Sequence, residues 1–160
     1  MKKYILFLAG LLLLLCACTS PRRTEGDCLL YFPNSSYLET TALGTQSIDL
    51  PEDIPPEEAL ITALLAGPTQ EGLVSPFPKK VTLRSWYLRE NILHINLSEQ
   101  YGSLSGISLT LADCSITLTL CQLEHIDGVV ITVENDPIPF RYRQTLSLQD
   151  ILLPTTNSFS

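Results

Sequence analysis

The chain has 160 residues, 45% of them hydrophobic, and its 17 acidic residues outnumber 10 basic ones to give a formal net charge of −7. This charge argues against nucleic acid as a partner and against electrostatic binding to anionic lipid, because both are negatively charged themselves. The length suits one domain with a single hydrophobic core.

The N-terminus has the pattern of a secretory signal. Two lysines, Lys2 and Lys3, precede an almost unbroken apolar run over residues 4–15. A basic end followed by a short apolar stretch is typical of such signals. The run is shorter than the roughly 20 apolar residues that a membrane-spanning helix requires. We therefore expect this segment to direct export and then to be removed.

The expected cleavage site contains two cysteines in the sequence Leu15-Cys16-Ala17-Cys18. It resembles a lipobox, in which leucine and a small residue precede a cysteine that receives diacylglycerol. Cys16 fits poorly, because leucine stands directly before it where a lipobox has Gly, Ala or Ser. The resemblance predicts a lipoprotein signal peptide over residues 1–17 and lipid on Cys18, which would anchor the protein on the extracytoplasmic face of the cell membrane. An ordinary secretory signal cut nearby is the alternative.

The exported part is more acidic than the whole chain. Loss of the two N-terminal lysines leaves 8 basic and 17 acidic residues, a formal charge of −9. Residues 18–27 have little apolar content and are predicted to be a tether. Three further cysteines, Cys28, Cys114 and Cys121, allow at most one internal disulfide, and the sequence does not fix its pairing.

The first half of the exported part contains a predicted strand and a predicted helix. Residues 28–32 are apolar with two aromatics and are stopped by Pro33-Asn34, which predicts a strand. Residues 35–54 are polar and are expected to be mostly loop. A helix then begins at Pro55-Pro56, carries two glutamates at its positive end, and ends at Gly67-Pro68.

The second half contains a predicted hairpin and a further strand. Residues 81–88 alternate apolar and polar side chains, and residues 92–97 are rich in Leu and Ile, so the turn would be residues 89–91. This turn lacks the Asn-Gly or Asp-Gly that marks a hairpin strongly. Residues 129–133, Val-Val-Ile-Thr-Val, predict the further strand.

Residues 107–123 give two conflicting signals. Apolar and hydroxyl residues alternate over residues 114–120, as in a strand. The segment is nevertheless long for a strand, which typically has about 3 to 10 residues. A buried helix would use a single apolar face formed by Leu109, Ala112, Ile116, Leu120 and Leu123. We predict the helix, for the reason given next.

Five segments, in this order, resemble the GerMN domain of sporulation and spore-germination proteins from Gram-positive bacteria: residues 31–34, 63–68, 78–83, 95–98 and 117–120. The family's segment similar to residues 107–123 is helical. The resemblance implies an α+β fold, a single β-α-β-β-α-β domain over residues 28–136 with two helices packed on one face of a small sheet. Residues 137–160 would then be a C-terminal extension. Members of this family are commonly exported lipoproteins.

The reactive side chains of the sequence do not form a recognisable catalytic or metal-binding motif. The two histidines, His94 and His125, have no recognisable nucleophile beside them, and residues 102–106 depart from G-x-S-x-G because Leu104 is central. Cys121 and His125 would share a helix face like half of a zinc site, but such a site needs three or four ligands. We therefore predict no catalytic residue, no metal site and no cofactor.

A modest basic cluster, Lys79, Lys80 and Arg84, stands out in the acidic chain. Solvated surface is one interpretation, and a docking patch for an acidic partner or a wall polymer is the other. The sequence predicts a non-catalytic interaction or scaffold domain at the cell envelope, in sporulation or germination, with an envelope protein as partner. A lipoprotein that binds a cell-wall fragment or a small solute is the alternative, and a hydrolase is less favoured.

Overall fold

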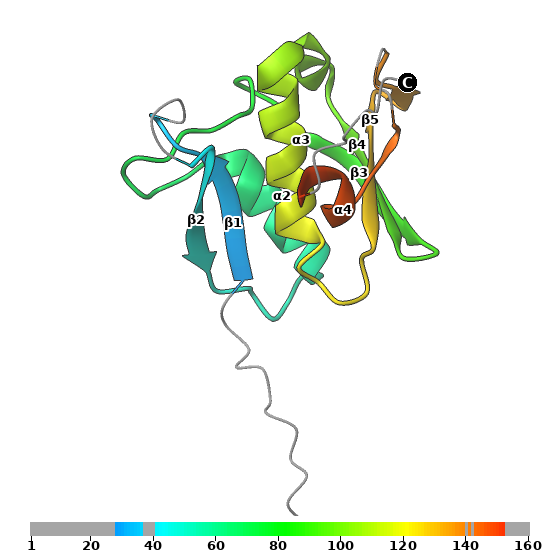
Figure 1. Cartoon of the computed structure of the whole chain (residues 1–160). Coiled ribbons are helices and arrows are strands. Elements are labelled where there is room, and N and C mark those ends of the chain that lie inside the picture. Colours follow the sequence, from blue (N-terminus) through cyan, green and yellow to red (C-terminus); the bar gives the residue numbers. More distant parts are fainter. Residues whose placement is uncertain (1–27, 37–40, 140, 142, 153–160) are drawn as a thin grey trace, which may run out of the picture.

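In a computed structural model, the described part of the chain comprises residues 28–36, 41–139, 141 and 143–152. It forms the predicted α+β domain, with helices between two sheets (Figure 1). The predicted signal peptide, the tether and Cys18 lie outside the described residues, as does the end of the predicted C-terminal extension.

The larger sheet contains the strands of the second half of the chain. Its order is β3 (Leu83–Arg89), β4 (Ile92–Leu97), β5 (Gly128–Val133) and β6 (Asp136–Pro137), and β7 (Thr145–Leu146) also pairs with β5. β3 and β4 form the predicted antiparallel hairpin, whereas β4 and β5 are parallel. A parallel pair requires a crossover, which the 3-10 helix η2 (Glu99–Ser103) and α3 (Gly106–Leu120) provide.

A second, two-stranded sheet includes a strand that the sequence did not predict. β1 (Cys28–Pro33) pairs antiparallel with β2 (Leu43–Ile48), so the prediction of mostly loop over residues 35–54 is wrong for this segment. The sequence of β2, Leu-Gly-Thr-Gln-Ser-Ile, is largely polar. It is extended because its backbone forms hydrogen bonds with that of β1. The pattern of residues within β2 itself contains no sign of such a distant partner.

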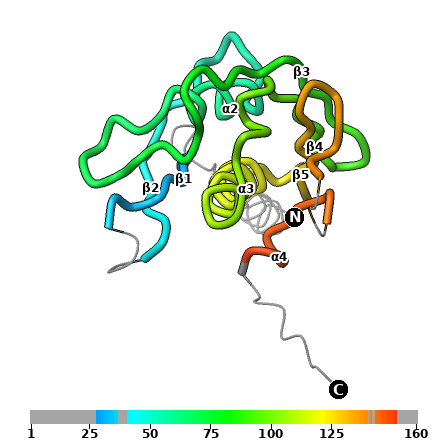
Figure 2. The backbone as a smooth tube through the Cα atoms, turned by 90° about the horizontal axis from the view of Figure 1, so that it is seen from above, coloured from blue at the N-terminus to red at the C-terminus, as the bar shows by residue number. Residues whose placement is uncertain are grey.

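The helices lie between the two sheets. Figure 2 shows α3 almost end-on, with β1 and β2 on one side and β4 and β5 on the other. α2 (Pro56–Ala66) contacts α3, β1 and β3. Both helices therefore pack on one face of the larger sheet, as the family resemblance implied. β1 differs from that expectation in one respect, because it belongs to the separate small sheet.

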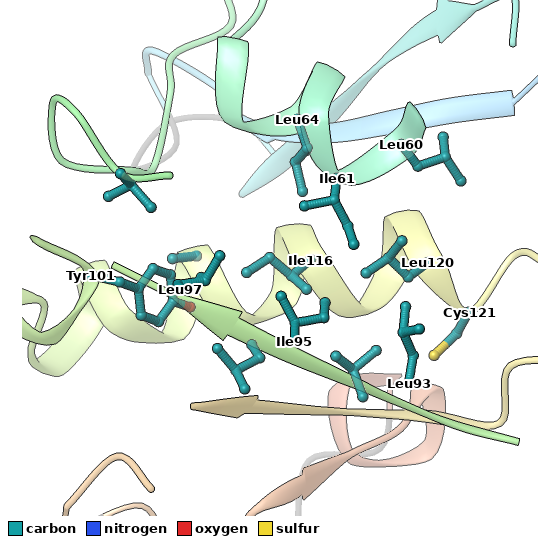
Figure 3. Packing of buried hydrophobic residues seen from close by; sticks show 14 of the residues in the cluster. Leu60, Ile61, Leu64, Leu93, Ile95, Leu97, Tyr101, Ile116, Leu120 and Cys121 are labelled. Carbon is teal, nitrogen blue, oxygen red and sulfur yellow. The ribbon is translucent and has the colours of Figure 1, made fainter. Parts of the chain in front are cut away.

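The hydrophobic core fills the space between the helices and the larger sheet (Figure 3). It is formed by alternate residues of β4 and by one face of each helix, and it includes Leu60, Ile61, Leu64, Leu93, Ile95, Leu97, Ile116 and Leu120. All of these are at most 3% exposed. Full burial of one such side chain contributes about 1.5–3 kcal/mol, so this cluster is the main source of stability.

The disputed segment is helical, and the small sheet explains one of its buried hydroxyl residues, Thr119. Thr119 Oγ1 accepts a hydrogen bond from the Tyr31 backbone N–H at 3.1 Å. Gln122, just after the helix, binds the N–H and the C=O of Leu29 at 2.9 and 2.7 Å. Thr119 at the end of α3 and Gln122 just after it therefore satisfy backbone groups on the edge of β1 that faces away from β2.

Two tight hairpin turns use residues in the left-handed backbone region. Glu90 and Asn91 join β3 to β4 with φ of 51° and 61°, and Glu134 and Asn135 join β5 to β6 with φ of 49° and 72°. Two-residue loops of this kind match the twist of the flanking strands and favour asparagine. Asn91 thus adopts the left-handed conformation for which the hairpin prediction expected a glycine.

The chain continues past residue 136 in contact with the domain. β7 pairs with β5, and α4 (Leu148–Leu152) contacts α3. No described helix has the length and apolar character to cross a membrane.

Candidate functional site on the open face of the sheet

The face of the larger sheet that points away from the helices carries polar and aromatic side chains. Alternate residues of β4 enter the core, so His94 and Asn96 occupy the opposite face. The strand register places Tyr87 opposite His94 and Ser85 opposite Asn96 on one side, and Thr132 beside Asn96 on the other. Strand pairing thus gathers side chains that are far apart in the sequence.

Tyr87 and His94 form a stacked pair across the β3–β4 hairpin. Their ring centroids are 4.5 Å apart and the rings are inclined by only 5°. Tyr87 is nevertheless 55% exposed, so much of its ring still faces solvent. A cross-strand pair of this kind stabilises a hairpin by about 0.2–1 kcal/mol, and it also fixes the orientation of both rings.

Asn96 and Asn135 form a reciprocal amide contact next to this pair. Asn96 Nδ2 donates to Asn135 Oδ1 at 3.0 Å, and the Asn135 backbone N–H donates to Asn96 Oδ1 at 2.8 Å. Asn96 is only 8% exposed, so its amide needs these partners. The contact ties the β5–β6 turn to β4.

These side chains line a hollow of about 130 Å³, which we call the open-face hollow. Its lining includes Ser85, Tyr87, His94, Asn96, Thr132 and Asn135, and none of the described residues that line it is Asp, Glu, Lys or Arg. Pockets for whole small molecules are larger, at about 300–1,000 Å³. The hollow is therefore smaller than a typical small-molecule pocket and carries no formally charged lining residue among those described.

The predicted docking residues lie at and before the start of β3. Arg84 is the extra residue of a β-bulge, because pairing passes from Leu83 directly to Ser85. Its Nη2 is 3.0 Å from Glu134 Oε1, which offsets its charge. Lys79 and Lys80 are exposed in the preceding turn, and no carboxylate in the described ranges pairs with them. A docking role for the three residues stays a prediction.

The second histidine is outside the open-face hollow. His125 Nε2 lies 2.6 Å from Glu57 Oε1 in the first turn of α2, where the Glu57 side chain is only 10% exposed. Burial, helped by the charge of Asp127, raises the pKa of the Cys121 thiol to about 11. Within the described ranges, no group of three or more His, Cys, Asp or Glu residues could hold a metal ion.

A buried polar network joins α3 to the C-terminal segment, and the sequence did not indicate it. The Tyr101 hydroxyl donates to Asp113 Oδ1 at 2.7 Å, and Arg141 Nη2 donates to the same oxygen at 2.6 Å. Burial raises the pKa of the Asp113 carboxyl, and the charge of Arg141 opposes this only in part. The Arg141 side chain is only 6% exposed. A ligand from solvent therefore cannot reach this network, and its role is structural.

The fold and this site define a two-sheet α+β domain with a polar and aromatic sheet face that no other described segment covers. The family model described as "Germane: Sporulation and spore germination" matches residues 29–139. The chain therefore belongs to this family, which confirms the resemblance to GerMN domains.

Two solved structures of GerMN domains show the same fold. The first GerMN domain of the sporulation protein GerM from Bacillus subtilis has a TM-score of 0.62 and 18% identity, over 78% of this chain and 98% of that one. The tandem GerMN domains of the same protein give 0.58 and 19%, over 81% of this chain and 47% of that one. A protein from Clostridium perfringens that is named as a lipoprotein has 30% identity and a TM-score of 0.45, over 69% and 75%. No curated protein sequence matches this chain.

Proposed function

We propose that this protein is a lipoprotein, anchored on the outer face of the cell membrane by lipid on Cys18. Its GerMN domain would bind an envelope protein during spore formation or germination and would catalyse no reaction. The observation that carries this proposal is the family match over residues 29–139, taken together with the signal and lipobox pattern that precedes it.

The surroundings of the reactive side chains support a non-catalytic role. Enzymatic hydrolysis by Ser or Cys uses a nucleophile held next to a base. The His94 ring is stacked on Tyr87, and His125 is hydrogen-bonded to Glu57, so each histidine interacts with a residue other than a Ser or Cys nucleophile. Burial raises the pKa of both the Cys114 and Cys121 thiols, which leaves them poor nucleophiles.

The basic residues before β3 are our candidate for the protein-binding surface. Lys79 and Lys80 are exposed, and their positive charge stands out in a chain of net charge −7. Complementary charge mainly raises the rate of association and fixes partner choice. Among the described strands, β3 is also the end strand of the larger sheet, so a partner docked there would meet a strand edge that no described strand pairs with.

The test compares partner recovery between charge variants. Full-length protein would be isolated from sporulating cells with its associated membrane proteins, as wild type and as the double variant Lys79→Glu/Lys80→Glu. We expect the double variant to recover much less of one specific partner, and the residual association to depend less on salt. Arg89→Glu is the matched control, because Arg89 is an exposed basic residue at the far end of the same strand. Equal recovery with all three proteins would contradict the proposed surface.

A further inference from the structure

We propose that the open-face hollow binds one ring of an uncharged saccharide. This site goes beyond the proposed function, since it needs no protein partner. The inference rests on three features of the hollow: a fixed aromatic surface, exposed hydrogen-bonding groups that have no protein partner among the described residues, and the absence of charge among its lining residues.

The aromatic surface comes from Tyr87. A sugar ring with equatorial hydroxyls has a flat face of C–H groups, and such a face packs against an aromatic ring while the hydroxyls remain at the ring's edge. Tyr87 is 55% exposed, and its stacking on His94 at 4.5 Å already fixes its orientation. Binding therefore requires little additional ordering of this side chain, which favours affinity.

The hydrogen-bonding groups line the same hollow as Tyr87. The reciprocal contact between Asn96 and Asn135 uses Asn135 Oδ1 but not Asn135 Nδ2. Among the described residues, neither Asn135 Nδ2 nor the Ser85 hydroxyl has a protein partner. These groups include donors and acceptors, as sugar hydroxyls do, and the amide is held in place by the fixed turn.

The lack of charged lining residues and the small volume of the hollow restrict the ligands that it can bind. No Asp, Glu, Lys or Arg lines the hollow, so a phosphate or a carboxylate would find no countercharge there, and the net charge of −7 would repel it. The volume of about 130 Å³ accommodates one ring rather than a whole oligosaccharide. A longer glycan would place one residue in the hollow and extend across the sheet.

The experiment uses the purified full-length protein in a detergent without a sugar headgroup. The probe is a tetramer of β-1,4-linked N-acetylglucosamine, followed by saturation-transfer NMR, with an acidic tetramer of galacturonic acid as the charged comparison. We expect saturation of the ring C–H protons of the neutral probe and a weaker signal from the acidic one. Tyr87→Ala should raise Kd at least about tenfold, which corresponds to about 1.4 kcal/mol, whereas Tyr87→Phe should keep Kd near that of wild type.

A matched pair of turn variants tests the amide. Asn135→Gly removes the side chain yet tolerates the φ of 72°, and we expect it to raise Kd about fivefold, or about 1 kcal/mol. Asn91→Gly makes the same change at φ 61° in the other hairpin turn, outside the hollow, and should leave Kd unchanged. Circular dichroism would verify that each variant is folded. No saturation of the neutral probe, or equal Kd for wild type and Tyr87→Ala, would overturn the proposal. Because no partner is present, either result leaves the partner-recovery test of the proposed function unaffected.

Discussion

The backbone N–H of Tyr31 donates a hydrogen bond to Thr119 Oγ1 at 3.1 Å. A side chain on α3 thereby satisfies a backbone group on β1, and it joins the small sheet to the centre of the domain. Thr119 is fully buried, whereas Tyr31 is half-buried. This contact explains why a helix in the core carries a hydroxyl at this position.

Thr119→Val should therefore destabilise the protein more than the same change at Thr117. Valine keeps the shape but leaves the Tyr31 N–H without a partner, at a cost of about 1–3 kcal/mol. Thr117 is equally buried, but its hydroxyl only donates to the Asp113 carbonyl within the same helix, so its loss should cost less. Denaturant unfolding of both variants measures the difference. Equal loss of stability would mean that the contact to β1 contributes nothing.

The apolar face of α3 should be highly sensitive to truncation. Ile116 and Leu120 are 3% and 0% exposed, so replacing either with Ala should cost about 2–5 kcal/mol through lost burial and the cavity left behind. Thr117→Pro should be worse, because proline inside a helix removes a hydrogen bond and clashes with the preceding turn. Ile107→Ala is the control, since Ile107 is 68% exposed on the same helix. Thermal unfolding that ranked Ile107→Ala with Ile116→Ala would contradict this packing.

Asp113 should make stability fall as pH rises through the acid range. Burial raises the folded-state pKa of Asp113 above its ordinary value of 3.8, so the folded protein holds this proton more tightly than the unfolded chain. Its ionisation cost is absent below about pH 4 and fully present above the raised folded-state pKa. The free energy of unfolding would be measured against pH for wild type and Asp113→Asn. We expect the wild-type value minus the variant value to fall with rising pH, and a flat or rising difference would refute it.

Cys121 should react slowly with alkylating reagents in the folded protein. Its pKa of about 11 leaves a thiolate fraction at pH 8 that is roughly 100-fold below that of an unperturbed cysteine. Iodoacetamide labelling at each cysteine would be followed by mass spectrometry. Denaturant should restore ordinary reactivity, because it removes the burial that raises the pKa. Fast labelling of folded protein at pH 8 would be the contrary result.

The lipid anchor is tested at Cys18. We expect Cys18→Ala to escape lipoprotein signal peptidase and to lose labelling by a palmitate analogue in cells. Cys16→Ala should be processed and labelled like wild type, because the lipobox pattern selects the second cysteine. Labelling of Cys18→Ala at the wild-type level would exclude the anchor as assigned, and the protein would then be secreted or held by other means.

Features with a local physical cause could be predicted from the sequence alone. The helix at residues 56–66 is bounded by Pro55 and Gly67, as the prolines before it and the Gly-Pro after it predicted. The β3–β4 hairpin and β5 followed from alternation and β-branched content. Only the α3 segment needed the family resemblance, because its hydroxyl residues alternate with apolar ones as in a strand, although one of them, Thr119, binds the backbone of β1 from a helix.

The tertiary structure alone decided the features that depend on distant partners. β2 is a strand because β1 pairs with it. Arg141 is buried because its guanidinium forms an ion pair with the Asp113 carboxylate. The open-face hollow exists only because strand pairing brings Tyr87 to His94 and the β5–β6 turn brings Asn135 to Asn96. Capping and alternation act over a few neighbouring residues, whereas strand pairing and buried ion pairs act between residues that only the folded chain brings together.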